Sequence, residues 1–284
     1  MSGSDRSPLI PVAGLVDLLS AGTPLTLLDA RFNLQGPDAH QEYLHAHLPG
    51  AVWVDVEQAL CGPRGERGRG GRHPLPDSDT AVRVLRACGV RDDRPVVVYD
   101  GGSQLGAARV WWLLEDLGHR DVRVLDGGLP AWLAAGLPIM SGETRAEPGD
   151  LTGRRGRLPV VDADGVVSAL AAGHAVWDVR AADRFRGEYE TIDPVAGHIP
   201  GASSKPAALV FTAEGTLRNP GELAGLFADV SPGDVLSCGS GLTAMLQLLA
   251  LRHAGRADGV AVYAGSWSDW ISDPSRPVAT GPQD

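Results

Sequence analysis

Cys238 stands where a short apolar run gives way to a helical pattern, within VLSCGSGLTAMLQLLALRHAG (residues 235–255). Gly239 and Gly241 follow it, with Ser240 between them. Glycines let the backbone turn tightly, so successive N–H groups at the start of a helix can face one point and bind an anion. Such donors stabilise a thiolate, the nucleophilic form of cysteine. The pattern predicts a reactive Cys238; the alternative is a buried cysteine that only packs at the end of a strand.

The residues around Cys238 argue against three familiar kinds of catalytic site. A cysteine phosphatase would carry an arginine to hold the phosphoryl oxygens, and Ala244 occupies that position. A nucleophile-elbow serine hydrolase would carry Gly-x-Ser-x-Gly, which the sequence lacks. A thiol–disulfide oxidoreductase would carry Cys-x-x-Cys, and Cys238 has no cysteine near it. The remaining chemistry is sulfur transfer, in which Cys238 accepts a sulfur atom as a persulfide and passes it on.

Four short stretches occur twice in the same order, which indicates two copies of one structural unit. The pairs are LLDAR (27–31) with VWDVR (176–180), HLPGA (47–51) with HIPGA (198–202), PVVVYDGGSQLGAARVWWLLEDLGH (95–119) with DVLSCGSGLTAMLQLLALRHAG (234–255), and VRVLDGGLPAW (122–132) with VAVYAGSWSDW (260–270).

Each copy alternates short apolar runs with helical stretches, which predicts an α/β fold. Residues 96–99 and 235–237 are expected to be buried strands, each followed by glycines and a helix, with Gly255 ending the second helix. This alternation is typical of a parallel sheet flanked by helices on both faces. Ligands bind such sheets at the carboxyl ends of the strands, which is where Cys238 stands.

The domain boundaries follow from the repeat. We expect an N-terminal domain over 1–140, a polar, glycine-rich linker over 141–160 and a C-terminal domain over 161–284. An arginine- and glycine-rich insertion at 61–72 occurs in the first copy only, and we expect it to be a flexible, solvated loop.

The composition limits the partners and the compartment. The 284 residues carry a formal charge of −10, which disfavours nucleic acid or an anionic membrane as the main partner. No apolar run is long enough to cross a membrane, and the N-terminus lacks the features of a secretory signal. The three cysteines are widely spaced, which argues against a disulfide framework or a zinc site and favours reduced thiols in the cytoplasm. No cofactor or metal is expected.

Asp100 occupies in the first copy the position that Cys238 occupies in the second. With the markers DAR…HLPGA, VVVYDGG, GHIPGA and GSWSDW, the chain resembles the two-domain (tandem) rhodanese sulfurtransferases over about residues 11–277. The loop CGSGLTA is similar to the Cys-Gly-Ser-Gly-Val-Thr-Ala loop of the 3-mercaptopyruvate branch. Members of the thiosulfate branch carry basic residues directly after the cysteine.

The resemblance implies two rhodanese-like domains, of which the N-terminal one is non-catalytic. It implies a transferase that moves sulfur from 3-mercaptopyruvate to a thiol, such as a thioredoxin-like protein, or to cyanide, through a Cys238 persulfide. Apart from the resemblance, the cysteine usage indicates the cytoplasm, and we expect a monomer. Thiosulfate sulfurtransfer on the same fold is one alternative, and a non-catalytic tandem interaction module is another.

The resemblance also implies roles for individual residues. Arg184 matches the substrate-binding arginine. Ser240 is expected to protonate the pyruvate enolate, with Asp38 and His47 completing a relay. The alternative for His47 is a structural role in a turn, because His198 repeats it in the second copy. The remaining substrate contacts are expected from the cysteine loop, at Gly239, Gly241, Leu242 and Thr243.

Two positions depart from the pattern of the family. The 3-mercaptopyruvate branch usually carries a second arginine nine residues after the first, and Asp193 stands there. Ala264 precedes Gly-Ser-Trp where an aspartate is usual, and Asp126 keeps that aspartate in the first copy.

Overall fold

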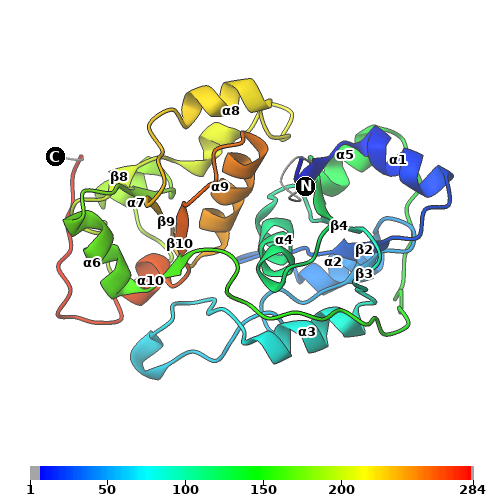
Figure 1. Cartoon of the computed structure of the whole chain (residues 1–284), viewed down its shortest axis with the longest axis horizontal. Coiled ribbons are helices and arrows are strands. Elements are labelled where there is room, and N and C mark those ends of the chain that lie inside the picture. The colour runs from blue at the N-terminus through cyan, green and yellow to red at the C-terminus, as the bar shows by residue number, and fades with distance from the viewer. Residues whose placement is uncertain (1–6, 283–284) are drawn as a thin grey trace. The chain divides into compact units, whose positions relative to one another are not determined.

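The computed structural model describes residues 7–282, which form two compact units (Figure 1). Within the described residues, unit 1 comprises 7–61, 76–157 and 213–217, and unit 2 comprises 62–75, 158–212 and 218–282. Along these residues, no helix has the length and apolar content needed to cross a membrane.

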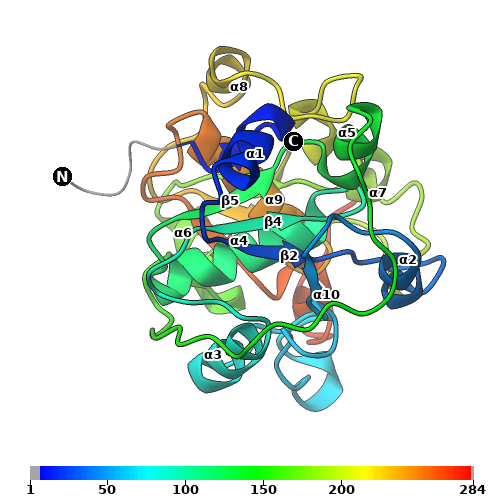
Figure 2. The same cartoon turned by 90° about the vertical axis from the view of Figure 1, so that its right-hand side faces the viewer.

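Unit 1 is a five-stranded parallel sheet with the strand order β1-β5-β4-β2-β3. Figure 2 shows β2, β4 and β5 from a second direction. Every residue of β2 and β4 is buried, as expected for a sheet covered on both faces. The elements are β1 (Leu9–Ile10), α1 (Val12–Ser20), β2 (Thr26–Asp29), α2 (Ala39–His45), β3 (Val52–Trp53), α3 (Ser78–Ala87), β4 (Val96–Tyr99), α4 (Leu105–Leu117), β5 (Val122–Leu125) and α5 (Gly128–Ala134).

Unit 2 repeats this topology with the strand order β6-β10-β9-β7-β8, again all parallel. The α/β fold with two tandem parallel sheets is therefore confirmed. The elements are η1 (Glu66–Gly68), β6 (Val160–Val161), α6 (Ala163–Ala171), β7 (Val176–Asp178), α7 (Ala182–Arg186), β8 (Ser203–Ser204), η2 (Ala207–Val210), α8 (Pro220–Leu226), β9 (Val235–Ser237), α9 (Leu242–His253), β10 (Ala261–Tyr263) and α10 (Ser266–Trp270).

The glycine-rich segment 62–75 packs in unit 2, although it follows strands of unit 1 in the sequence. The Gly70 N–H donates to the Asp269 carboxylate at 2.7 Å, and the Arg72 N–H donates to the Ser268 hydroxyl at 3.0 Å. Residues 63–67, 69 and 70 are exposed, as expected of a solvated loop, but the end of the segment is held in unit 2. Composition did not indicate these contacts because the partners lie almost 200 residues further along the chain.

The polar stretch at 141–160 lies mostly exposed, as expected of a surface linker, and one residue anchors it to unit 1. Leu151 is fully buried, and its N–H donates to the Val90 carbonyl oxygen at 3.2 Å. Residues 213–217, in turn, belong to unit 1, where the Leu217 N–H donates to the Asp126 carboxylate at 2.9 Å. Both units are thus discontinuous in sequence, which a division into 1–140 and 161–284 does not capture.

The repeated Asp-x-Arg sequence forms a buried ion pair at the end of a strand in each unit. Arg180 donates to both oxygens of Asp178, at 3.0 and 2.6 Å, and to the Gly197 carbonyl oxygen at 2.7 Å. Its guanidinium lies 4.9 Å from the centre of the Trp267 ring. Asp29 and Arg31 pair in the same way in unit 1. The repeat therefore marks a charge pair that connects a strand to the turn preceding the next strand.

Asp178→Ala is expected to destabilise the protein by about 3–5 kcal/mol, because it leaves the Arg180 guanidinium buried without its main counter-charge. The side chains of Arg180 and Asp178 are only 2% and 3% exposed. Denaturant unfolding followed by fluorescence measures the change. Glu188→Ala, which breaks an exposed ion pair with Arg186, is the control and should leave the unfolding midpoint unchanged. Equal effects of the two substitutions would contradict this account of the buried pair.

Candidate functional site

Cys238 lies at the carboxyl end of β9, directly before α9, and is only 1% exposed. The Gly241 N–H donates to its sulfur at 3.1 Å. The Ser266 hydroxyl lies 3.7 Å from the sulfur, accepts from the Cys238 N–H at 3.0 Å and donates to the Tyr263 carbonyl oxygen at 2.8 Å. The sulfur is therefore held at the start of a helix by an amide donor, with a hydroxyl close by that the sequence did not reveal.

Glycine is required at position 241 for two reasons. Its φ is +93°, in the region that side chains other than glycine disfavour. A Cβ there would also lie 2.4 Å from the Ala264 carbonyl oxygen. The next two residues of the loop, Leu242 and Thr243, form the first turn of α9, with Leu242 buried and Thr243 half-buried. Gly241 thus permits the close turn that brings its own N–H to the Cys238 sulfur.

Arg184, on α7, lies beside the cysteine loop. Its Nε and Nη2 donate to the two oxygens of Glu190 at 3.0 and 2.9 Å, and Nη2 also donates to Asp193 at 3.0 Å. Its Nη1 and Nη2 lie 3.8 and 3.9 Å from where a Cβ on Gly239 would stand. The alternative that Arg184 is an ordinary surface residue does not fit this placement.

Arg72 is a second guanidinium at the same place, and sequence reasoning missed it. Its Nη1 is bonded to the second oxygen of Asp193, and its Nη2 lies 3.2 Å from the Cβ position of Gly239. Asp193 therefore bridges Arg72 and Arg184. The signal that could have indicated this pair was Asp193 itself, since an acidic residue in an anion-binding site needs a cationic partner.

The charges of this cluster stabilise one another. Burial alone would raise the pKa of Glu190, but N–H groups of Asp193 and Ile192 and the Arg184 guanidinium hold that pKa below its ordinary value. Burial would lower the pKa of Arg180, but the charges of Asp178, Glu190 and Cys238 raise it above its ordinary value. Both groups are thus held in their charged forms.

His73 is the histidine that the structure places against Ser240. Its Nδ1 lies 2.8 Å from the Ser240 hydroxyl oxygen, and both residues are buried. His73 directly follows the insertion at 61–72, and nothing in the sequence indicated that it lies beside Ser240.

In unit 1, the side chains of His47 and Asp38 make hydrogen bonds that hold a turn and the start of a helix. The His47 ring bonds through Nδ1 to the Tyr43 carbonyl oxygen at 2.9 Å and through Nε2 to the Thr144 hydroxyl at 3.1 Å. His198 repeats the first contact, with its Nδ1 2.8 Å from the Phe185 carbonyl oxygen. The Asp38 carboxylate caps the start of α2. The repeated histidine therefore anchors a turn in each unit.

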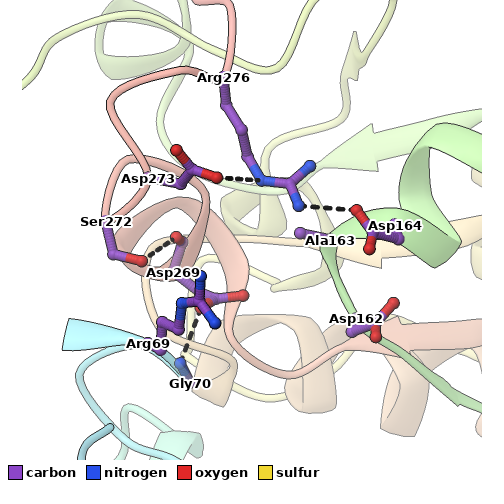
Figure 3. A pocket seen from close by; sticks show the side chains of 9 residues that line it. All are labelled: Arg69, Gly70, Asp162, Ala163, Asp164, Asp269, Ser272, Asp273 and Arg276. Carbon is purple, nitrogen blue, oxygen red and sulfur yellow. Dashed lines mark hydrogen bonds and ion pairs between the residues drawn. The ribbon is translucent and has the colours of Figure 1, made fainter. Parts of the chain in front are cut away.

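A cavity of about 490 Å³ lies elsewhere in unit 2, and neither Cys238 nor Arg184 lines it (Figure 3). Arg276 bonds to Asp164 at 2.8 Å across it. Its wall also includes Arg69, Asp162, Asp269 and Asp273. Within residues 7–282, no group of three or more His, Cys, Asp or Glu side chains is arranged to hold a metal ion. The chemistry around Cys238 is thus separate from this cavity.

Two stretches of the chain, residues 12–135 and 162–273, match the rhodanese-like domain family. This chain belongs to the rhodanese-like family. A Pseudomonas aeruginosa protein, provisionally named a 3-mercaptopyruvate sulfurtransferase, is 46% identical over 90% of this chain and 93% of its own length. A Mycobacterium tuberculosis protein, SseB, provisionally named a thiosulfate sulfurtransferase, is 41% identical over 96% of this chain and 97% of its own. The crystal structure of SseA from Escherichia coli, described as a 3-mercaptopyruvate sulfotransferase, superposes with a TM-score of 0.79 at 32% identity, covering 93% of this chain and all of SseA.

The first rhodanese-like domain shows what the equivalent loop binds when it lacks the cysteine. The Asp100 carboxylate accepts from the N–H groups of Gly102 at 2.8 Å, Gln104 at 3.0 Å and Ala107 at 3.4 Å. Burial raises the pKa of Asp100 even though these donors favour its charged form. The loop of the rhodanese-like fold is therefore an anion site, and in the first domain the protein's own carboxylate occupies it.

Gly241→Ala is expected to lower activity by about 100-fold, because the displaced loop misplaces the Cys238 sulfur. Gly255→Ala is the matched control: Gly255 follows α9 with φ +68°, and nothing lies within 4 Å of its Cβ position. Both variants should lose about 1–3 kcal/mol of stability from the strained backbone, but only Gly241→Ala should lose activity. Turnover and thermal unfolding measured on both variants test this, and an active Gly241→Ala enzyme would contradict the close-turn argument.

Proposed function

We propose that this protein is a sulfurtransferase that takes a sulfur atom from 3-mercaptopyruvate onto Cys238 and passes it to a thiol or to cyanide. The single observation that supports it most is the Cys238 sulfur at the end of β9, bonded to the Gly241 N–H, with two guanidiniums beside Gly239. The relatives named as sulfurtransferases span almost the whole chain.

The proposed reaction has two steps. The Cys238 thiolate attacks the sulfur of 3-mercaptopyruvate, the sulfur–carbon bond breaks, and its electron pair moves to carbon to give the enolate of pyruvate. The enolate carbon takes up a proton and leaves as pyruvate, so that Cys238 is left as a persulfide. An acceptor thiolate or cyanide then attacks the outer sulfur and restores the Cys238 thiolate, as in other covalent exchange mechanisms.

Ser240 and His73 are the proposed source of the proton. The serine hydroxyl is two residues from the nucleophile, and the His73 Nδ1 lies 2.8 Å from its oxygen. Ser240 protonates the enolate carbon, and His73 replaces the serine proton. His73 takes the position in the relay that sequence comparison gave to His47 and Asp38, whose hydrogen bonds hold a turn and a helix end.

Arg184 is the proposed partner of the donor carboxylate: its Nε and Nη2 are bonded to Glu190 and Asp193, and its Nη1 makes no hydrogen bond within the described residues, so it can donate to the ligand. The residues after Cys238 carry no charge, which suits a donor whose one negative charge lies away from the sulfur. Thiosulfate is the second candidate donor, because the Mycobacterium tuberculosis relative is named for it. The same guanidiniums can bind sulfonate oxygens.

The proposed setting is the cytoplasm, with the chain acting as a monomer and a thioredoxin-like thiol as the acceptor. Cys61, Cys88 and Cys238 are free thiols. Free thiols are typical of a reducing compartment. The proposed reaction requires Cys238 to be a free thiol, because a cysteine in a disulfide cannot attack the donor.

Cys238→Ser is expected to abolish sulfur transfer with the fold intact, because a serine hydroxyl cannot carry a persulfide. Intact-mass measurement after exposure to 3-mercaptopyruvate should show one added sulfur atom in the wild type and none in the variant. Cys88→Ser is the control and should keep full turnover, because burial raises the pKa of Cys88 to about 11 and leaves it a thiol at neutral pH. Full turnover by Cys238→Ser would overturn the proposal.

Ser240→Ala is expected to lower kcat with 3-mercaptopyruvate by about 100-fold, the usual contribution of a positioned proton donor. With thiosulfate it should change kcat little, because departing sulfite needs no proton on carbon. His73→Asn should likewise lower kcat with 3-mercaptopyruvate and change kcat little with thiosulfate. His47→Asn should lower the stability of the protein, and its kcat should not depend on the donor in this way. Equal losses with both donors would mean that Ser240 only shapes the loop.

A further inference from the structure

We infer that Asp269, on α10, is a positioning residue for the proton relay, which holds the glycine-rich segment 62–75 so that His73 lies against Ser240. The inference rests on the proposed function and adds to it the group that sets the distance between the two members of the relay. The Asp269 carboxylate is bonded to the main chain of the segment at Gly70, so it acts on His73 through the segment.

The first argument is that the start of α10 is bonded to the cysteine loop. The Trp267 N–H donates to the Cys238 carbonyl oxygen at 3.0 Å, and the Ser268 N–H donates to the Gly239 carbonyl oxygen at 2.9 Å. Both donors belong to the main chain, so these bonds do not depend on which side chains follow in the helix. The start of α10 is therefore a fixed point beside the loop that carries Ser240.

The second argument is that side chains of the same helical turn hold the segment 62–75. The Gly70 N–H donates to Asp269 Oδ1 at 2.7 Å (Figure 3), and the Arg72 N–H donates to the Ser268 hydroxyl at 3.0 Å. His73 directly follows the second of these donors. The helix that fixes the cysteine loop through its main chain thus fixes the segment through its side chains, and so sets how far His73 lies from the loop.

The third argument is that the Asp269 carboxylate is itself held in place. The Tyr263 hydroxyl, from β10, donates to its Oδ2 at 2.6 Å. Burial raises the pKa of Tyr263, and the Asp269 carboxylate adds to that rise, so the hydroxyl stays a donor. Gly265 leaves room for the carboxylate, since a Cβ there would lie 2.7 Å from Oδ2. One oxygen is therefore bound by the core, and the other is presented to the segment.

The segment fits α10 closely only at the residues just before His73. Gly71 has a φ of +81°, and a Cβ on it would lie 2.4 Å from the Gly265 carbonyl oxygen. Residues 63–67, by contrast, are exposed. The place of His73 therefore depends on the bonds that residues 70–72 make, and Asp269 accepts the first of them.

Asp269→Leu removes the acceptor at similar side-chain size and is expected to lower kcat with 3-mercaptopyruvate by about 10-fold, less than the loss of a proton donor, because Ser268 still holds the segment. Alkylation of Cys238 by neutral iodoacetamide should stay at the wild-type rate. Asp269→Asn keeps an oxygen for the Gly70 N–H and should recover most of kcat. Asp273→Asn, in the wall of the same cavity (Figure 3), is the matched control and should match the wild type.

A double-mutant cycle separates positioning from a general structural role. In a His73→Asn background, Asp269→Leu should cause no further loss of kcat, because Asp269 acts only through His73. Ser268→Ala, which removes the second bond to the segment, should lower kcat in the same direction and show the same dependence on His73. Losses that multiply in the double variants would overturn the inference, as would a kcat for Asp269→Leu within about twofold of the wild type.

Hydrogen exchange followed by mass spectrometry tests the docking of the segment without turnover. Peptides that contain Gly70 and Arg72 should exchange about 10-fold faster in Asp269→Leu than in the wild type, and peptides of α9 should not change. Unchanged exchange of the segment would overturn the inference and leave the proposed function standing. If the wild type gains no sulfur atom from 3-mercaptopyruvate by intact mass, the proposed function fails, and the relay that Asp269 would serve fails with it.

Discussion

A buried chain of alternating carboxylates and guanidiniums connects the end of β7 to the cysteine loop, and the arrangement of the candidate site depends on it. Each buried charge in such a chain needs an opposite neighbour, because desolvation costs several kcal/mol per ion. Neighbours of opposite sign therefore fix one another's positions, and removing one leaves the next uncompensated. The chain runs Asp178–Arg180–Glu190–Arg184–Asp193–Arg72. The strand that starts it belongs to the core, so the fold determines where the guanidiniums at its far end lie.

The two copies show how the same loop differs when it carries Asp100 and when it carries Cys238. In unit 1 the Asp100 carboxylate takes up the amide donors of the loop, and Gly128 follows β5 with φ +56°. In unit 2 the equivalent position is Ser266, which holds φ +52° although it has a side chain. Such strain persists where the surroundings enforce it and often accompanies a functional site. In unit 2 this backbone conformation brings the Ser266 hydroxyl within reach of both the Cys238 N–H and the Cys238 sulfur. Gly128, at the same position in unit 1, adopts it without strain.

The sequence predicted the local features well. The strands at 96–99 and 235–237, the helix that starts at Leu242 and the glycine that follows it depend on periodicity and turn chemistry, which neighbouring residues determine. The sequence did not predict the contacts between segments that lie far apart along the chain. Arg72 and His73 meet partners 121 and 167 residues away, and the composition of 61–72, which ends at Arg72, indicated only solvent. For His47 the repeat at His198 indicated a turn and the resemblance indicated chemistry, and its hydrogen bonds to Tyr43 and Thr144 match the turn.

Asp193 shows why a site cannot be judged position by position. By resemblance alone, an acidic residue where an arginine is usual removes a binding charge and adds a repulsive one. In space, Asp193 brings in Arg72 from the segment 62–75, so the second guanidinium arrives from another part of the chain. An arginine side chain is long enough to reach this point from a different backbone position, and its planar guanidinium can donate to carboxylates at more than one edge. Two guanidiniums therefore lie beside the cysteine loop, although only one of them, Arg184, stands at a position that the resemblance indicated.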